Sequence, residues 1–203
     1  MAFDYLFWGA LDLDNVAHLH GLNGFDDDFE LDEGIPHAHD FPDDASFAMN
    51  KDFPNHTQLA DNLINTSSTV LISRKLRDFL EQYGTPDVEY LETRIINHKG
   101  KEIAERYSIV HPTVVADCID RKKSQATEDS NGSIERMAAF ALIDANIPDR
   151  PIFRVAGLGT FIVVRRDLAA AIDQAGFTGN RWVEASKLAN IELPPSVTSM
   201  PNW

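Results

Sequence analysis

Histidines in the first 60 residues are the side chains best suited to chemistry. His18-Leu-His20 and His37-Ala-His39-Asp40 each hold two imidazoles two positions apart. In an extended strand such residues project to the same side. With Asp40 as an oxygen ligand, they offer the donor types that zinc accepts. The spacing permits a metal site without being diagnostic, since no His-Glu-x-x-His motif accompanies it. The alternative is that these residues are exposed histidines in a polar loop. We favour this alternative and expect no metal site.

One cysteine is a second candidate for chemistry. Cys118 with His98 or His111 would supply a nucleophile and its base. However, Cys118 lies inside the apolar run Val-Val-Ala-Asp-Cys-Ile, which is typical of a buried and unreactive thiol. Gly157-Leu-Gly159 lacks the third glycine and the following helix of a phosphate-binding loop. We therefore expect no catalytic residues and no cofactor.

Charge is distributed very unevenly along the chain. The first 60 residues hold thirteen of the 32 acidic side chains and one basic side chain, Lys51, so they carry −12 of the formal charge of −14. Such a field repels nucleic acid and anionic membranes and attracts basic protein surfaces. We therefore expect a basic protein partner, no nucleic acid and no membrane. The alternative is a solvated acidic face that only keeps the protein soluble.

Composition and length indicate one soluble unit. The 203 residues are 43% hydrophobic, which is enough for a buried core in a single domain. No apolar run approaches the ~18 to 20 residues of a membrane span. The start, MAFDYLFWGALDLD, lacks the basic region of a signal peptide. The expected location is the cytoplasm.

Two similar segments predict the framework that must position any site. Residues 70–84 and 162–176 align without a gap. Each begins with aliphatic residues, continues with apolar residues at helical spacing and ends in glycine. A short strand is expected after each, at 88–91 and 181–183. The segment 93–111 between them predicts a β-hairpin with its turn at His98-Lys-Gly-Lys101.

The remaining segments complete the predicted α+β or α/β fold, a single compact domain. Strands are expected at 114–119, 153–155 and 161–164, and an exposed loop at 121–133. Residues 137–143 are apolar but too short to distinguish helix from strand. The predicted organisation is an acidic N-terminal part, residues 1–33, packed on the main domain, then an α+β domain over 34–190, then a proline-rich tail over 191–203.

Several runs together resemble the bacterial DUF1629 family, also called immunity protein family 11. They are GIPHAHDFPDD, DNLINTSSTVLISRKLRDFLEQYG, VEYLETRIINHKGKEI, YSIVHPTVVADCIDRKKS, IPDRPIFRVAG and FIVVRRDLAAAIDQAGFTGNRWVE. The resemblance extends from about Gly34 to Glu184. It implies a non-enzymatic protein that binds and neutralises a cognate bacterial toxin of a polymorphic toxin system.

The charge pattern and the resemblance lead to the same hypothesis. Toxins that act on nucleic acid or nucleotides have basic clefts, which an acidic surface would meet with complementary charge. Phe25, Phe29 and Phe41 are candidate apolar anchors. The candidate contact residues are Asp26, Asp27, Asp28, Glu30, Asp32 and Glu33, followed by Asp40, Asp43 and Asp44. The alternatives are a metal-dependent enzyme that uses the N-terminal His/Asp cluster and a non-catalytic scaffolding module.

Overall fold

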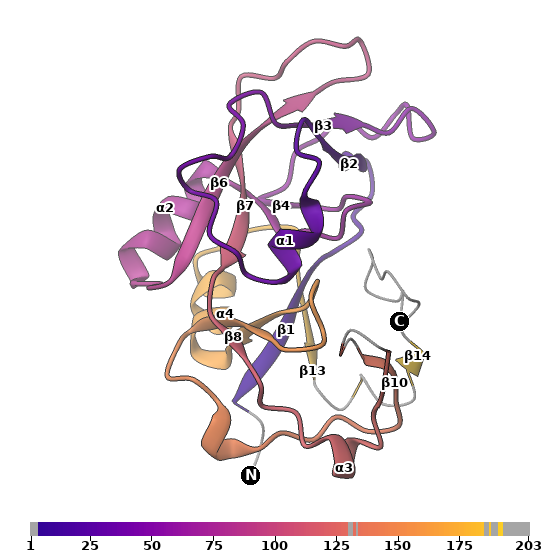
Figure 1. The fold of residues 1–203 in the computed structure, drawn as a ribbon. Helices are drawn as coiled ribbons and strands as arrows, with labels where there is room; N and C mark the ends of the chain where they lie inside the picture. Colours follow the sequence, from indigo (N-terminus) through magenta and orange to yellow (C-terminus); the bar gives the residue numbers. More distant parts are fainter. Residues whose placement is uncertain (1–3, 130–131, 133, 185–186, 188–190, 193–203) are drawn as a thin grey trace.

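Strands form three sheets in the part of the chain that the structure describes, and helices pack against them (Figure 1). The computed structural model describes residues 4–129, 132, 134–184, 187 and 191–192. The strands are β1 (Tyr5–Ala10), β2 (Leu19–Asn23), β3 (Ser46–Met49), β4 (Asn62–Leu63), β5 (Leu71–Ser73), β6 (Val88–Ile96), β7 (Tyr107–Pro112), β8 (Val115–Ala116), β9 (Thr127–Glu128), β10 (Ile134–Met137), β11 (Ile152–Val155), β12 (Ile162–Arg165), β13 (Asn180–Glu184) and β14 (Ile191–Glu192). The helical segments are α1 (Asp28–Asp32), α2 (Arg74–Tyr83), α3 (Arg121–Ser124), η1 (Asp144–Asn146) and α4 (Arg166–Gln174).

The first predicted strand-helix-strand unit is present as β5, α2 and β6. Helix α2 begins at Arg74 because the Ser73 hydroxyl accepts a hydrogen bond from the Leu76 amide and caps the helix. It ends before Gly84, whose φ of +88° is a left-handed conformation that glycine adopts without strain. Strand β7 lies between β5 and β6 and is antiparallel to both. The two strands of the unit are therefore parallel, with one strand inserted between them.

The second predicted unit, β12, α4 and β13, has the same arrangement. Here the inserted strand is β1, which is antiparallel to β12 and to β13. Gly176 follows α4 with a φ of +80°. The first sheet has the order β2-β3-β6-β7-β5-β4 and the second β13-β1-β12-β11-β8. This architecture confirms the predicted α+β class and both strand-helix-strand units.

One hydrophobic cluster joins the two larger sheets. Leu76 and Leu80 of α2 belong to the same buried cluster as Leu168 and Ile172 of α4, together with residues of β1, β5, β7, β11 and β12. The helices also meet directly, because the Tyr83 hydroxyl donates a hydrogen bond of 3.0 Å to the α4 carboxylate of Asp167. Figure 1 shows α2 and α4 on the same side of the molecule. The two units therefore share one core.

The predicted central hairpin is present as β6 and β7. Val88 lies opposite Pro112 and Thr93 opposite Tyr107, and the turn is closed by a hydrogen bond from the Asn97 amide to the Lys101 carbonyl. The short strand expected at 88–91 and the first hairpin strand are one continuous strand, β6. The hairpin places a long strand at the centre of the six-stranded sheet.

The segment 114–143 differs from the sequence prediction. The strand expected over 114–119 has only two residues, β8, and the expected loop at 121–133 contains α3 and β9. The Asp120 carboxylate caps α3 by accepting a hydrogen bond from the Lys123 amide at 3.0 Å. This local hydrogen bond, and not an apolar pattern, allows so short a helix to form. Of the ambiguous run 137–143, only Met137 lies in a strand, β10. The strands expected at 153–155 and 161–164 are present as β11 and β12.

The two ends of the chain enter different sheets. Strand β1 lies inside the five-stranded sheet, whereas β14 pairs with β10 in the three-stranded sheet. Most of the predicted proline-rich tail, residues 193–203, lies outside the described residues. Among the helices that the structure describes, none is long and apolar enough to cross a membrane.

Candidate functional site

Residues 24–45, which we name the acidic segment, cross the junction between the two larger sheets (Figure 1). Leu31 of α1 is 2% exposed and packs into the core of the six-stranded sheet. Gly34, three residues further along the chain, lies close to Val115. A Cβ added to Gly34 would be only 2.6 Å from the Val115 side chain. The Ile35 carbonyl accepts a hydrogen bond of 2.7 Å from His111 Nε2 on β7. The acidic segment is therefore fixed to both sheets.

Three carboxylates lie around His37. Its Nδ1 lies 3.1 Å from Asp40 Oδ1, and its Nε2 lies 3.1 Å from Glu30 Oε2. Its backbone N–H and that of Ala38 donate hydrogen bonds of 2.7 and 3.1 Å to Glu89 Oε2 on β6. With only 5% of its surface exposed, His37 is not the exposed loop histidine that the sequence suggested. It is buried because the acidic segment folds back onto β6, a tertiary contact without a local sequence pattern.

Asp32 is placed against a buried arginine. Arg154 of β11 is 3% exposed, and its Nη1 lies 3.9 Å from Asp32 Oδ1 and donates to the Gly159 carbonyl. Burial lowers the Arg154 pKa to about 10, and the charge of Asp32 opposes that shift. Gly159 leaves the room that Asp32 occupies, since a Cβ there would lie 2.7 Å from the Asp32 Cβ. Asp32 thus holds α1 on the turn between β11 and β12.

The other candidate acids point outward. Asp26, Asp27, Glu33, Asp43 and Asp44 are exposed. Within the described part of the chain, none of the five forms a side-chain ion pair. Asp28 begins helix α1, and only its backbone belongs to the described structure. The acidic segment therefore has an inner set of carboxylates that attach it and an outer set that faces solvent.

The three candidate aromatic anchors also differ in their exposure to solvent. Phe25 and Phe41 are half-buried, lie 5.2 Å apart between ring centroids and pack on the core of the six-stranded sheet. Phe29 of α1 is 57% exposed. Ile35, which follows Gly34, and Val115, which packs against Gly34, are 37% and 39% exposed. Phe29 is thus the aromatic residue of the acidic segment that is free to contact a partner.

The histidines that were weighed as possible metal ligands do not converge. His18 lies 2.8 Å from Asp12 and stacks on Phe53, and His56 contacts the Val16 carbonyl. His39 is exposed. In the ranges that the structure describes, no group of three or more His, Cys, Asp or Glu has a geometry that could hold a metal ion. Each histidine pair has local hydrogen-bond partners or faces solvent instead.

The thiol of Cys118, which was predicted to be unreactive, is buried. Cys118 is 0% exposed, and burial raises its pKa to about 11. At neutral pH the thiol is therefore protonated and shielded from reagents, as the apolar run around it predicted.

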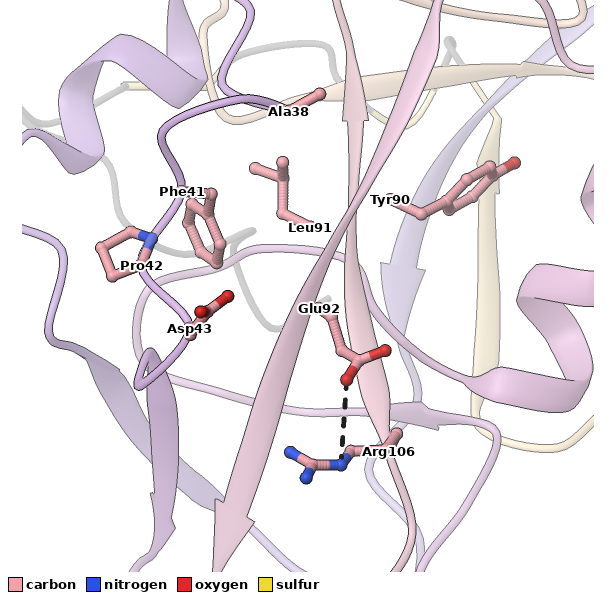
Figure 2. Close-up of a pocket in the computed structure, with 8 residues that line it drawn as sticks. All are labelled: Ala38, Phe41, Pro42, Asp43, Tyr90, Leu91, Glu92 and Arg106. Atoms are coloured by element: carbon pink, nitrogen blue, oxygen red, sulfur yellow. Dashed lines mark ion pairs between the residues drawn. The ribbon is translucent and has the colours of Figure 1, made fainter.

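A pocket of about 250 Å³ lies between the acidic segment and β6, and we name it the edge pocket. Figure 2 shows the Phe41 ring and the Leu91 side chain next to each other on one side of β6, whereas the Tyr90 ring points to the other side. Glu92 and Arg106 form an ion pair of 3.8 Å beside it. The lining residues are Ala38, Phe41, Pro42, Asp43, Tyr90, Leu91, Glu92 and Arg106. Asp43, one of the outward acids, therefore lies at the pocket.

The site is thus an exposed acidic segment that is held on a folded support by carboxylate contacts with the buried side chains of His37 and Arg154 and by hydrogen bonds. Residues 13–187 match the model of the immunity protein family Imm11, and the chain therefore belongs to this family. The match confirms the resemblance inferred from the sequence. Membership implies a toxin as the partner and a non-enzymatic, inhibitory role. No curated protein matches the chain.

Proposed function

We propose that this protein neutralises its cognate toxin by covering a basic surface of the toxin with the outer side of the acidic segment. The observation that supports the proposal is the division of the carboxylates. Glu30, Asp32 and Asp40 contact buried partners and fix the segment. Asp26 and Asp43 are examples of exposed acids that have no ion pair within the described structure. A segment held in this way presents fixed negative charge to a partner.

Rigid presentation favours tight binding. A segment that is already ordered loses little conformational entropy when it associates, so more of the contact energy appears as affinity. Phe29, 57% exposed between acidic residues, offers an aromatic anchor of the kind that dominates protein interfaces. The acids around it would steer a basic partner and raise its association rate by ~10- to 1000-fold.

The charge complementarity favours a toxin that acts on nucleic acid or nucleotides. The substrate-binding cleft of such a toxin is basic because it binds phosphates. An acidic inhibitor that occupies the cleft excludes the substrate directly. Toxin and inhibitor would meet in the cytoplasm, where these substrates are found.

The experiment is a comparison of two fourfold neutralised variants. One carries Asp26→Asn, Asp27→Asn, Asp43→Asn and Asp44→Asn, and the control carries Glu105→Gln, Glu135→Gln, Asp144→Asn and Asp149→Asn. All eight residues are exposed, and both variants lose the same formal charge. Stopped-flow association with the toxin domain encoded by the neighbouring gene is measured at ~0.01 M and ~0.15 M salt, where the screening length falls from ~30 to ~8 Å.

The acidic-segment variant should associate at least tenfold more slowly than the parent at low salt, and the difference should narrow at high salt. The association rate of the control variant should fall much less. Equal rates for the two variants would show that the acidic segment does not direct binding. Growth rescue on co-expression with the toxin tests the broader immunity function separately, and undiminished killing would reject it.

A further inference from the structure

One edge of β6 is only partly paired. Strand β3 pairs with Arg94, Ile95 and Ile96 and extends no further along β6. The acidic segment is hydrogen-bonded to β6 at Glu89, which accepts from the His37 amide, and at Arg94, whose amide donates to the Ala45 carbonyl and whose side chain donates to the Asp43 carbonyl. The stretch of β6 between these two contacts, residues 90–92, has no neighbouring strand on this side.

The backbone of this stretch points into the gap. The Val110 amide donates to the Val70 carbonyl and therefore points away from β6. Tyr90 lies opposite Val110, so the two form a non-hydrogen-bonded pair and the Tyr90 N–H and C=O also point outward. The backbone N–H and C=O of Glu92 point the same way as those of Tyr90, because the direction of these groups repeats every second residue along a strand. Among the described residues, none pairs with these backbone groups of Tyr90 or Glu92.

The edge pocket lies over this free edge (Figure 2). Its volume of about 250 Å³ is below the ~300–1000 Å³ of sites for drug-sized ligands, which favours a short piece of polypeptide over a cofactor. Phe41, Pro42 and Leu91 give it an apolar wall. Two extended residues span about 7 Å, the length of β6 from residue 90 to residue 92.

We propose that a short extended segment of the toxin adds to β6 in the edge pocket and forms backbone hydrogen bonds with Tyr90 and Glu92. Strand addition of this kind is a general mode of peptide recognition at exposed sheet edges. The inference rests on the proposed function, because it takes the toxin as the partner, and it specifies how the toxin is held.

The charge around the pocket selects a basic segment. Residues 37–45 contain three aspartates and neither lysine nor arginine. The one arginine of the pocket lining, Arg106, is paired with Glu92 at 3.8 Å and with Glu102 at 3.2 Å. The carboxylate of Asp43 at the pocket has no ion pair in the described part of the chain. An extended segment with a lysine or arginine beside its apolar residues would match both the wall and the charge.

Amide hydrogen exchange tests the inference directly. The probe is an inactivated form of the toxin domain from the neighbouring gene, mixed with the full chain. The Tyr90 and Glu92 amides should exchange at least tenfold more slowly in the complex, while those of Leu91 and Thr93, which face β7, are protected in both states. Unchanged exchange at Tyr90 and Glu92 in a formed complex would overturn the inference and leave the proposed function standing. If no complex forms, both fail.

Proline substitution provides a second test. Glu92→Pro removes the outward N–H and no ladder hydrogen bond, as proline does at an edge. Glu92→Ala is the reference because it removes the same carboxylate and keeps the N–H. The Kd of Glu92→Pro for the toxin should be about tenfold higher than the Kd of Glu92→Ala. Equal affinities of two folded variants would reject strand addition.

Filling the pocket keeps the inference testable if Glu92→Pro does not fold. Ala38→Phe places a ring in the edge pocket from an exposed position, and Ala38→Ser is its control. Ala38→Phe should weaken toxin binding at least tenfold relative to Ala38→Ser, and equal binding would count against the inference. Protection of the Tyr90 amide that rises with the concentration of this protein alone would show that a second copy occupies the edge, which also overturns it.

Discussion

The burial of His111, which donates a hydrogen bond to the Ile35 carbonyl, should make the stability of the protein depend on pH. His111 is 0% exposed. Burial is the main reason that its pKa falls to about 4, with smaller lowering effects from Arg154 and His37. The bond to the Ile35 carbonyl and the charge of Glu89 oppose that shift. The folded protein therefore keeps this imidazole neutral at pH values where the unfolded chain protonates it.

The sign and size of the effect follow from the two pKa values. Above pH ~6.5 the imidazole is neutral in both states and contributes no pH dependence. As the pH falls, the unfolded chain gains a proton that the folded protein does not bind, so the free energy of unfolding decreases. With pKa values of 6.5 unfolded and about 4 folded, the loss is about 2 kcal/mol between pH 7 and pH 5 and about 3 kcal/mol in total.

Urea unfolding of the parent and of His111→Gln at pH 7 and pH 5 measures this loss. Glutamine can donate its side-chain N–H to the Ile35 carbonyl and does not titrate. The carboxylates titrate in both proteins, so their effect cancels in the comparison. The parent should lose about 2 kcal/mol more than His111→Gln between the two pH values. Equal losses would refute the argument that the folded protein keeps a buried, neutral imidazole at His111.

Two further predictions concern single positions. His37→Ala should lower the free energy of unfolding by about 2 kcal/mol in urea titrations, because it leaves a cavity at a buried position and removes the side chain that Glu30 and Asp40 contact. His39→Ala at an exposed site should change this free energy by less than about 0.5 kcal/mol. Gly179→Ala should cost more than about 3 kcal/mol by the same assay, since its Cβ would lie 2.2 Å from the Asn62 carbonyl oxygen at a φ of +79°. Gly100→Ala, with a φ of +71° and open space around it, should cost only about 1 kcal/mol. Similar losses at the two glycines, or at the two histidines, would contradict the packing described above.

The regular part of the fold was predictable because it depends on local patterns. The helical spacing of Leu76 and Leu80, with Gly84 behind them, defines α2 in the sequence and in the structure alike. The insertion of β1 between β12 and β13 has no local pattern, because it depends on pairing between distant segments. Helix α3 was missed because a single capping bond from Asp120 supports it.

The candidate site was predictable in its location and charge but not in the role of each residue. The sequence shows that acids cluster at 26–44, yet Asp26 and Asp32 look alike there. Only the fold reveals that Asp32 faces Arg154, an arginine more than 120 positions away. Glu89 is likewise an ordinary strand residue in the sequence, and it becomes an anchor of the acidic segment through the His37 amide. Such roles arise from tertiary contacts that residue type and spacing do not encode.

The position of β1 has a consequence for synthesis on the ribosome. The six-stranded sheet uses only residues 19–112, and it carries the acidic segment and the edge pocket. Strand β1 is translated before both of its partners, and β12, the earlier of the two, follows about 150 residues later. At ~5–20 residues per second, the N-terminal strand waits about 8 to 30 s for them. During this time β1 is unpaired, and the acidic segment also lacks its contact with Arg154 of β11, so the face proposed for the toxin is completed only after most of the chain has been translated.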